Sequence, residues 1–150
     1  MVDMKDYSLG LYEKSMPASL SWKEKLLAAK AAGFDFIEIS IDETDEKLAR
    51  LYTSKQERLK LIETMYETGL DIRTMCLSGH RKYPLGSSDP KIIDKSLEIM
   101  ERAIELALDL GIRIIQLAGY DVYYEESTKE TVDRFENNLK KATLMAAKAG

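Results

Sequence analysis

Short apolar segments alternate along this chain with longer segments in which apolar residues recur every three or four positions. The short segments are rich in Ile, Leu and Phe, a composition typical of strands buried in a parallel sheet. Residues 90–110 represent the longer segments: Ile93, Leu97, Met100 and Ile104 lie on one helical face, and charged residues lie opposite. This alternation predicts an α/β fold with parallel strands and helices outside the sheet.

Helix starts are predicted where a hydroxyl residue precedes a glutamate by three positions, as in a capping box, or where an acid precedes proline. Such starts occur at Ser21 with Glu24, Ser54 with Glu57, Ser127 with Glu130, and Asp89 with Pro90. The predicted strands are residues 8–12, 34–40, 72–78 and 112–118. The predicted helices are residues 22–32, 55–68, 90–110 and 128–149, with a short helical turn at 46–51.

A glycine closes each of three predicted helices, directly before the next strand. Gly33, Gly69 and Gly111 occupy this place at intervals of about 40 residues, the length of one βα unit. Glycine enters the left-handed conformation that ends many helices without steric cost. The chain therefore consists of repeated βα units, and Gly150 follows a fourth helix in the same way.

Two architectures accommodate these repeated units. A doubly wound, flavodoxin-like domain would be complete at this length, but no glycine-rich phosphate loop follows the first strand. A (β/α)8 TIM barrel needs roughly 250 residues, so this chain would supply its first four units. We expect residues 1–150 to form a single domain, the N-terminal half of a TIM barrel, and keep the flavodoxin-like fold as the alternative.

Composition and charge exclude several classes of protein. With 45% apolar residues the chain is not disordered, and no apolar run is long enough for a transmembrane helix. A net charge of −4 argues against non-specific nucleic-acid binding. The first residues carry acids where a signal peptide needs basic and apolar residues, and a single cysteine is typical of a reducing compartment. We expect a cytoplasmic protein without nucleic-acid or membrane partners, with Cys76 as an inert core thiol.

Candidate chemistry lies in the loops after the strands, because the carboxyl ends of parallel strands form the functional face of either architecture. These loops combine acids, phenols, cations and the only histidine, which suits a polyhydroxylated, anionic small molecule. The candidate substrate-binding residues are Tyr12, Glu13, Glu43, His80, Arg81, Tyr120, Asp121 and Tyr123.

Each candidate also has a structural alternative. His80 either donates to a sugar oxygen or packs at the barrel rim. Glu13 either binds a sugar hydroxyl or has a structural role, as a cap or in an ion pair with Lys14. Glu43 precedes a predicted helical turn, so helix capping is the alternative there. Arg81 either attracts a phosphate or is surface charge, and the loop tyrosines either line a pocket or only pack.

Four segments around these loops carry a family resemblance. They are LGLYEK at residues 9–14, FDFIEISIDETD at 34–45, CLSGHRKYPLGS at 76–87 and IQLAGYDVYY at 115–124. Together they resemble the L-ribulose-5-phosphate/L-xylulose-5-phosphate 3-epimerases, also catalogued as hexulose-6-phosphate isomerases. The resemblance runs along essentially the whole chain, and the stretches at 80–86 and 117–124 are specific to that family.

The resemblance implies a xylose-isomerase-like (β/α)8 barrel that interconverts L-ribulose 5-phosphate and L-xylulose 5-phosphate, in L-ascorbate and pentose breakdown. It also implies a divalent metal (Mn, Mg or Zn) on a Glu, Asp, His, Glu set. In that family the metal stabilises an enediolate while two glutamates exchange the C3 proton.

In that family the metal ligands come from the fifth to eighth strands, whereas this chain ends at Gly150 and has one histidine. We therefore expect no metal ligand and no catalytic residue here, and no activity of the chain alone. We also expect an open sheet with two free edges and an apolar inner face, through which the chain forms a homo-oligomer. The alternative is a non-catalytic half-barrel that binds a pentulose phosphate without converting it.

Overall fold

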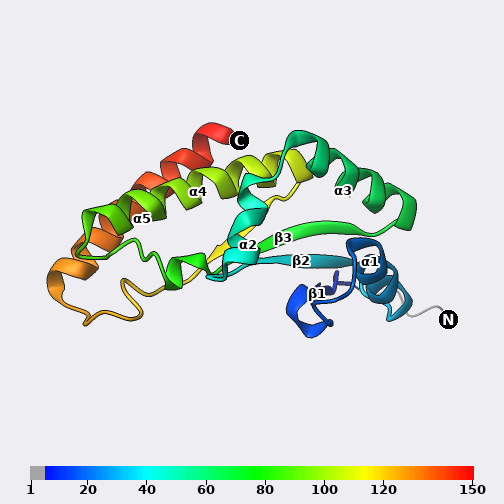
Figure 1. The fold of residues 1–150 in the computed structure, drawn as a ribbon, viewed down its shortest axis with the longest axis horizontal. Helices are drawn as coiled ribbons and strands as arrows, with labels where there is room; N and C mark the ends of the chain where they lie inside the picture. Colours follow the sequence, from blue (N-terminus) through cyan, green and yellow to red (C-terminus); the bar gives the residue numbers. More distant parts are fainter. Residues whose placement is uncertain (1–5) are drawn as a thin grey trace.

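The computed structural model describes residues 6–150 (Figure 1). Its strands are β1 (Gly10–Tyr12), β2 (Phe36–Ile41), β3 (Asp71–Leu77) and β4 (Ile114–Leu117). Its α-helices are α1 (Trp22–Ala31), α2 (Asp45–Ala49), α3 (Lys55–Thr68), α4 (Pro90–Leu110) and α5 (Lys129–Ala149). Three short 3-10 helices, which the sequence did not predict as such, are η1 (Glu13–Ser15), η2 (Arg50–Tyr52) and η3 (Gly79–Arg81).

The four strands form one parallel sheet in the order β1-β2-β3-β4. Helices α3, α4 and α5 arch over one face of this sheet, and α1 packs beside α3 (Figure 1). A flavodoxin-like sheet has strands out of sequence order and helices on both faces, so that alternative is not supported. Sequential parallel strands with outer helices are the arrangement of half a TIM barrel, which confirms the predicted fold class.

Helix starts follow the predicted caps with one correction. The capping boxes at Ser21 and Ser54 are present, each hydroxyl accepting from the backbone N–H three residues later. The third box was predicted one residue too early: Thr128, not Ser127, caps α5 and pairs with Thr131. The chain is still extended at Thr128, with φ −130° and ψ 171°, so the helix begins only after it. A cap of this kind contributes about 1 kcal/mol.

Helix ends also agree with the predicted glycines. Gly69 and Gly111 have φ values of 66° and 72°, and their N–H groups bond to carbonyls of α3 and α4. This left-handed conformation turns the chain from each helix into the following strand. No helix within residues 6–150 combines the length and apolarity needed to cross a membrane.

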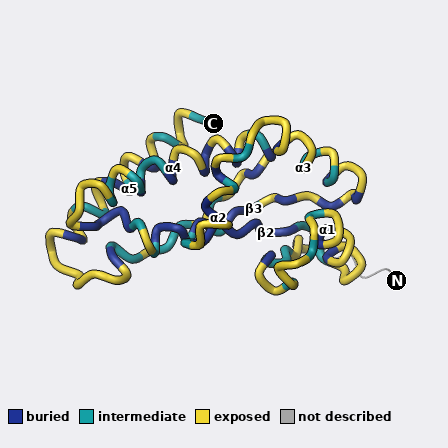
Figure 2. Tube along the Cα trace, viewed as in Figure 1, coloured by how far each residue is buried: buried dark blue, intermediate teal, exposed yellow. Residues whose placement is uncertain are grey.

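The helix-covered face of the sheet forms the apolar core. Alternate residues of β2, namely Ile37, Ile39 and Ile41, are at most 2% exposed and share one cluster with Leu26 of α1 and Ile99 of α4. Figure 2 shows buried positions along β2 and β3 and exposed positions on the outer sides of the helices. Truncating such a core residue to Ala costs about 2–5 kcal/mol.

The open face of the sheet is polar, which corrects the expectation of an apolar inner face. Glu38 lies beside Thr74 and Ser40 beside Cys76, at positions that alternate with the core residues. The Thr74 hydroxyl donates to Glu38 at 2.7 Å, and Gln116 of β4 is exposed next to Cys76. Cys76 is half-buried on this face rather than enclosed in the core. The expectation failed because most apolar residues of these strands face the helices; Phe36 and Ile114 are exceptions on the open face.

Candidate functional site

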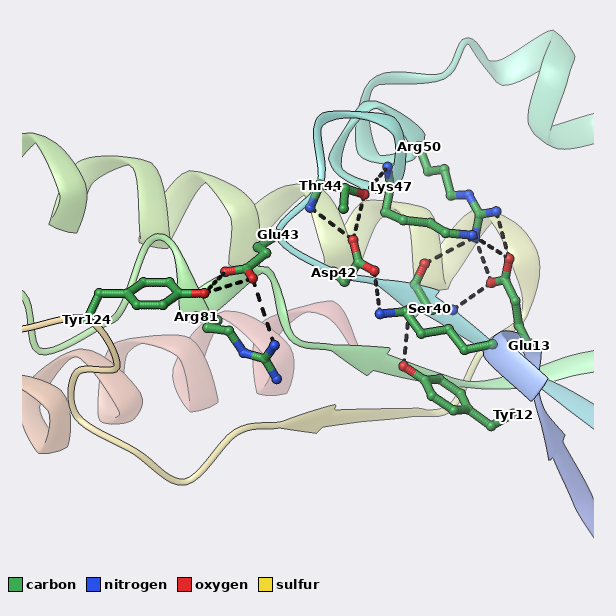
Figure 3. A network of polar contacts seen from close by, with 11 residues as sticks. Tyr12, Glu13, Ser40, Asp42, Glu43, Thr44, Lys47, Arg50, Arg81 and Tyr124 are labelled. Atoms are coloured by element: carbon green, nitrogen blue, oxygen red, sulfur yellow. Dashed lines mark hydrogen bonds and ion pairs between the residues drawn. The ribbon is translucent and has the colours of Figure 1, made fainter. Parts of the chain in front are cut away.

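The carboxyl ends of the four strands lie along one edge of the sheet, where binding sites form in folds of this class. Figure 3 shows polar side chains from several loops meeting there. Ion pairs around Glu13 and Asp42 make up one group, and Glu43 with Arg81 and Tyr124 makes up another.

Glu13, at the start of η1, is buried among three cations. Its Oε1 accepts from Lys25 Nζ at 2.9 Å, Lys47 Nζ at 2.8 Å and Arg50 Nη2 at 2.7 Å. Its Oε2 accepts from Arg50 Nη1 at 2.6 Å and the Ser40 N–H at 2.8 Å. The residue is 1% exposed. Both carboxylate oxygens are therefore committed to protein donors.

This cation cluster keeps the Glu13 carboxylate ionised. Burial alone raises the pKa of Glu13, but hydrogen bonds from Arg50 and Lys47 outweigh burial and hold that pKa well below its usual range. The Trp22 ring contacts Lys25 and Arg50, each 5.1 Å from the ring centroid. The cluster thereby ties the ends of β1 and β2 to α1 and α2.

Tyr12 lies at the end of β1, beside the open face. Its hydroxyl is 3.1 Å from the Ser40 hydroxyl, and it also interacts with Cys76. Burial raises the pKa of the Tyr12 phenol, so it stays protonated at neutral pH and can both donate and accept a hydrogen bond.

Asp42, directly after β2, forms the ion pair with Lys14 that was one alternative for Glu13. Its carboxylate lies 2.5 Å from Lys14 Nζ and accepts from the N–H and hydroxyl of Thr44. Burial raises the pKa of Asp42, but these partners prevail and lower it. Lys14 thus pairs across to the next loop and not with its neighbour in sequence.

A tyrosine–arginine cluster, consisting of Glu43, Arg81, Tyr120, Tyr123 and Tyr124, joins the loops after β2, β3 and β4. The Tyr124 hydroxyl donates to the Glu43 carboxylate oxygens at 3.0 and 3.2 Å. The Arg81 guanidinium lies 3.8 Å from Glu43 and 4.7 Å from the Tyr123 ring centroid. The Tyr120 and Tyr123 centroids are 5.1 Å apart. These contacts place phenols, a carboxylate and a cation within reach of one ligand.

His80, the central residue of η3, packs against α4 and is 4% exposed. Its Nε2 donates to the Ser96 carbonyl at 3.0 Å, since a carbonyl can only accept. Burial lowers the pKa of His80, so the ring is neutral at pH 7. This geometry favours the packing alternative over a direct contact with a sugar oxygen.

Asp121 organises the start of α5. Its Oδ2 accepts from the hydroxyls of Thr131 and Ser127, which lower the pKa of Asp121. Its carbonyl accepts from the Gly86 N–H at 3.0 Å. A Cβ on Gly86 would lie 2.6 Å from that carbonyl oxygen and 2.5 Å from the Thr131 oxygen, so this close approach requires glycine. The loops after β3 and β4 are thereby joined.

The described residues offer no metal site. Within residues 6–150, no three His, Cys, Asp or Glu side chains are grouped so that they could hold an ion. The divalent metal implied by the family resemblance therefore has no ligand set among them.

Several site residues were not predicted from the sequence, namely Lys25, Asp42, Lys47 and Arg50. One signal was present: Lys25 lies four residues before the buried Ala29 and next to the buried Leu26, on the core side of α1. A lysine on the core side of a helix must find a buried partner, because an unpaired buried charge is costly.

Comparison with known proteins agrees with this geometry. Residues 26–150 match the protein family described as Xylose isomerase-like TIM barrel. L-ribulose-5-phosphate 3-epimerase UlaE of Escherichia coli O139:H28 is 52% identical over 145 residues, which are 97% of this chain and 51% of that protein. The protein of the same name from Shigella sonnei is also 52% identical, with the same shares covered. The chain thus spans about half the length of the curated relatives it matches.

Solved structures share the fold. D-psicose 3-epimerase, crystallised with D-fructose, superposes with a TM-score of 0.77 at 16% identity, over 96% of this chain and 50% of that chain. L-ribulose 3-epimerase superposes with a TM-score of 0.68 at 26% identity, over 95% of this chain and 46% of that chain. With the family match over residues 26–150 and the half-barrel topology, the chain belongs to the xylose isomerase-like TIM barrel family.

Proposed function

We propose that this chain forms one half of the substrate site of a sugar-phosphate 3-epimerase that interconverts L-ribulose 5-phosphate and L-xylulose 5-phosphate. The observation that carries the proposal is the rim of hydrogen-bonding side chains at the carboxyl edge, beside a polar sheet face. The 52% identity to UlaE over 97% of the chain supports the substrate class.

In this proposal the substrate-facing residues are Tyr12, Glu43, Arg81, Tyr120 and Tyr123. The phenols exchange hydrogen bonds with sugar hydroxyls, Glu43 accepts, and the tyrosine rings offer apolar faces to the carbon skeleton. All of them belong to segments that follow or end a strand at the carboxyl edge.

The other three candidates support the site from behind. Glu13 fixes the ends of β1 and β2, His80 joins η3 to α4, and Asp121 joins the last loop to α5. The Glu13 and Asp121 carboxylates and the His80 Nε2 are held by protein partners, and the His80 Nδ1 is buried with no partner among the described residues. We therefore assign these three residues positioning roles instead of direct contact.

Epimerisation at C3 removes the proton beside the C2 carbonyl and returns it to the opposite face, which needs acid–base groups on both faces. At the carboxyl edge of this chain, Glu13, Asp42 and Glu43 are held by lysine, arginine and tyrosine donors. We therefore assign this chain substrate binding, and we assign proton transfer and any metal to the half of the relatives that it does not match. A cytoplasmic location belongs to the same proposal, supported by the single unpaired cysteine.

The free edge of β4 supports a further set of βα units beside it. A cavity of about 360 Å³ lies there, lined by apolar residues that include Ile104, Ile115, Leu117 and Ala142. Ile114 on this strand is 61% exposed. Four more units, from a longer polypeptide or a second copy of the chain, would complete the ring of eight strands.

Fusing this chain to the unmatched half of the E. coli relative tests the proposed function. The fusion should convert L-ribulose 5-phosphate and exchange its C3 proton with D2O, while the 150-residue chain alone should do neither. The intact relative is the matched control. A fusion that folds but converts no substrate refutes the proposed activity, and turnover by the chain alone refutes the assigned division of roles.

A further inference from the structure

Glu38 is a charged residue in the middle of the sheet that lacks a counter-charge. The four described strands carry three charged side chains, those of Glu38, Asp71 and Arg73. Asp71 and Arg73 lie together at the amino end of β3, where Arg73 Nη2 is 3.6 Å from the Asp71 carboxylate. Among residues 6–150, the Glu38 carboxylate has no ion-pair partner, and its hydrogen bond comes from the Thr74 hydroxyl.

The surroundings of Glu38 become a barrel interior when the ring is completed. Tyr12, Glu38, Thr74 and Ile114 form one row across the four strands, on the open face. Glu38 is half-buried there, and Ile114 is 61% exposed. The interior of an eight-stranded barrel is filled by packed side chains, so closing the ring removes water from this row. An ionised carboxylate in such a place is costly unless it is paired.

The hydrogen-bonding groups of this face do not satisfy Glu38. Thr74 donates to Oε2 at 2.7 Å, and Oε1 has no hydrogen-bond partner within the part of the chain that the structure describes. The phenol of Tyr12, the neighbour on β1, lies 3.1 Å from the Ser40 hydroxyl instead. A carboxylate accepts several hydrogen bonds, and a cationic donor supplies both a bond and the opposite charge.

We propose that the βα units completing the ring present a lysine or arginine side chain that pairs with Glu38 inside the barrel. This inference rests on the proposed function, in which further units lie beside β4, and it specifies the chemistry of their inner face. A second copy of this chain fits poorly, because it would bring a second Glu38 and an arginine already paired with Asp71. The unmatched half of the E. coli relative is therefore the partner that we favour.

Urea unfolding of the fusion to that half, compared with unfolding of the 150-residue chain, tests the inference. In the fusion, Glu38→Gln should raise the unfolding equilibrium constant by about 100-fold or more, because a buried cation loses its partner. In the 150-residue chain the increase should stay below about tenfold, since the amide oxygen still accepts from Thr74. Glu63→Gln, on the exposed side of α3, is the matched control and should change either constant by no more than about threefold.

Two further sets of variants identify the charge and its partner. Glu38→Asp keeps the charge and should lose less than Glu38→Gln in the fusion; it decides by the same comparison if the Gln variant does not fold. Lysines and arginines of the fused half can then be replaced one at a time in the parent fusion and in Glu38→Gln. The partner is the residue whose loss is not additive with that of Glu38.

The outcomes separate this inference from the proposed function. An equal loss in the chain and the fusion, or no loss in the fusion, overturns the paired charge. A loss that Arg73→Gln reproduces also overturns it, because the partner then belongs to this chain. Turnover by a fusion that is insensitive to Glu38→Gln refutes the inference alone, and the expected loss without turnover refutes the proposed function alone. A fusion that does not fold, as judged by circular dichroism, overturns both, because the two inner faces then do not match.

Discussion

Glu13→Gln removes the buried carboxylate that three cations share and keeps the size of the side chain. Glu13 is 1% exposed and accepts from Lys25, Lys47 and Arg50 at 2.6 to 2.9 Å. In the variant, the amide oxygen of Gln still accepts hydrogen bonds. The amide NH2 group, however, points its N–H donors at the N–H donors of the lysines and the arginine. We expect a loss of about 3–5 kcal/mol of unfolding free energy, typical of buried charges left without their partner.

The size and the pH dependence of this loss both follow from the ionised carboxylate. A domain of this size has a total stability of about 5–15 kcal/mol, so the loss is a large fraction of it. The pKa of Glu13 in the folded state lies below its ordinary value of 4.5. The carboxylate therefore stabilises the fold fully above pH 4.5, and this stabilisation is lost as the pH falls below that value. The difference between parent and variant should be constant near neutral pH and shrink on acidification.

Urea unfolding followed by Trp22 fluorescence measures this loss, because Trp22 is the single tryptophan and contacts two of the cations. The matched control is Glu67→Gln, which breaks the ion pair between Glu67 and Lys23. The side chain of Glu67 is 61% exposed and that of Lys23 is 59% exposed. That change should cost about 0–1 kcal/mol. If Glu13→Gln costs no more than the control, the buried network does not stabilise the fold and the reasoning fails.

Three further outcomes are expected. Gly86→Ala should lower the unfolding free energy in urea by about 1–3 kcal/mol, because the new Cβ would lie 2.5 Å from the Thr131 carbonyl oxygen; an unchanged midpoint would contradict the close approach. The ring protons of His80, followed by NMR, should titrate with a midpoint below pH 6.5, since burial favours the neutral ring. The unfolding free energy should therefore fall as the pH drops below 6.5. A midpoint above 6.5 would exclude the buried site. Tyr124→Phe removes the hydrogen bonds to Glu43 and should speed amide exchange in residues 119–125 at a global cost of no more than about 1.5 kcal/mol; unchanged exchange would show that the tether is not formed.

The framework was predictable because its signals are local. Gly69 and Gly111 end their helices, and Ser54 begins α3, through contacts within a few residues. The start of β4 was predicted too early, at residue 112, because the N–H of Ile112 bonds to the carbonyl of Ala107 and so completes the end of α4. The ladder begins only at Ile114. An apolar run does not show which of its residues belong to a helix cap.

The site was predictable only in its location. The candidate residues do follow the strands, but their partners come from distant segments: Arg50 reaches Glu13 across 37 positions and Tyr124 reaches Glu43 across 81. Proximity in sequence suggested Lys14 as the partner of Glu13, yet Lys14 meets Asp42 in the next loop. Such pairings depend on how strands are placed side by side, which no local pattern specifies.

The two sides of the rim are held with unequal strength, and this difference agrees with the roles assigned to them. On the β1–β2 side, Glu13 accepts five hydrogen bonds from donors that are largely shielded from water, so displacement would leave several charges unpaired. On the β4 side, the exposed hydroxyl of Tyr124 tethers the loop to Glu43, and each such bond contributes only about 0.5–1.5 kcal/mol. Displacing the β4 loop therefore costs less than displacing the β1–β2 side. In the proposed function, the β1–β2 side is accordingly the fixed wall of the site and the β4 loop is its adjustable side.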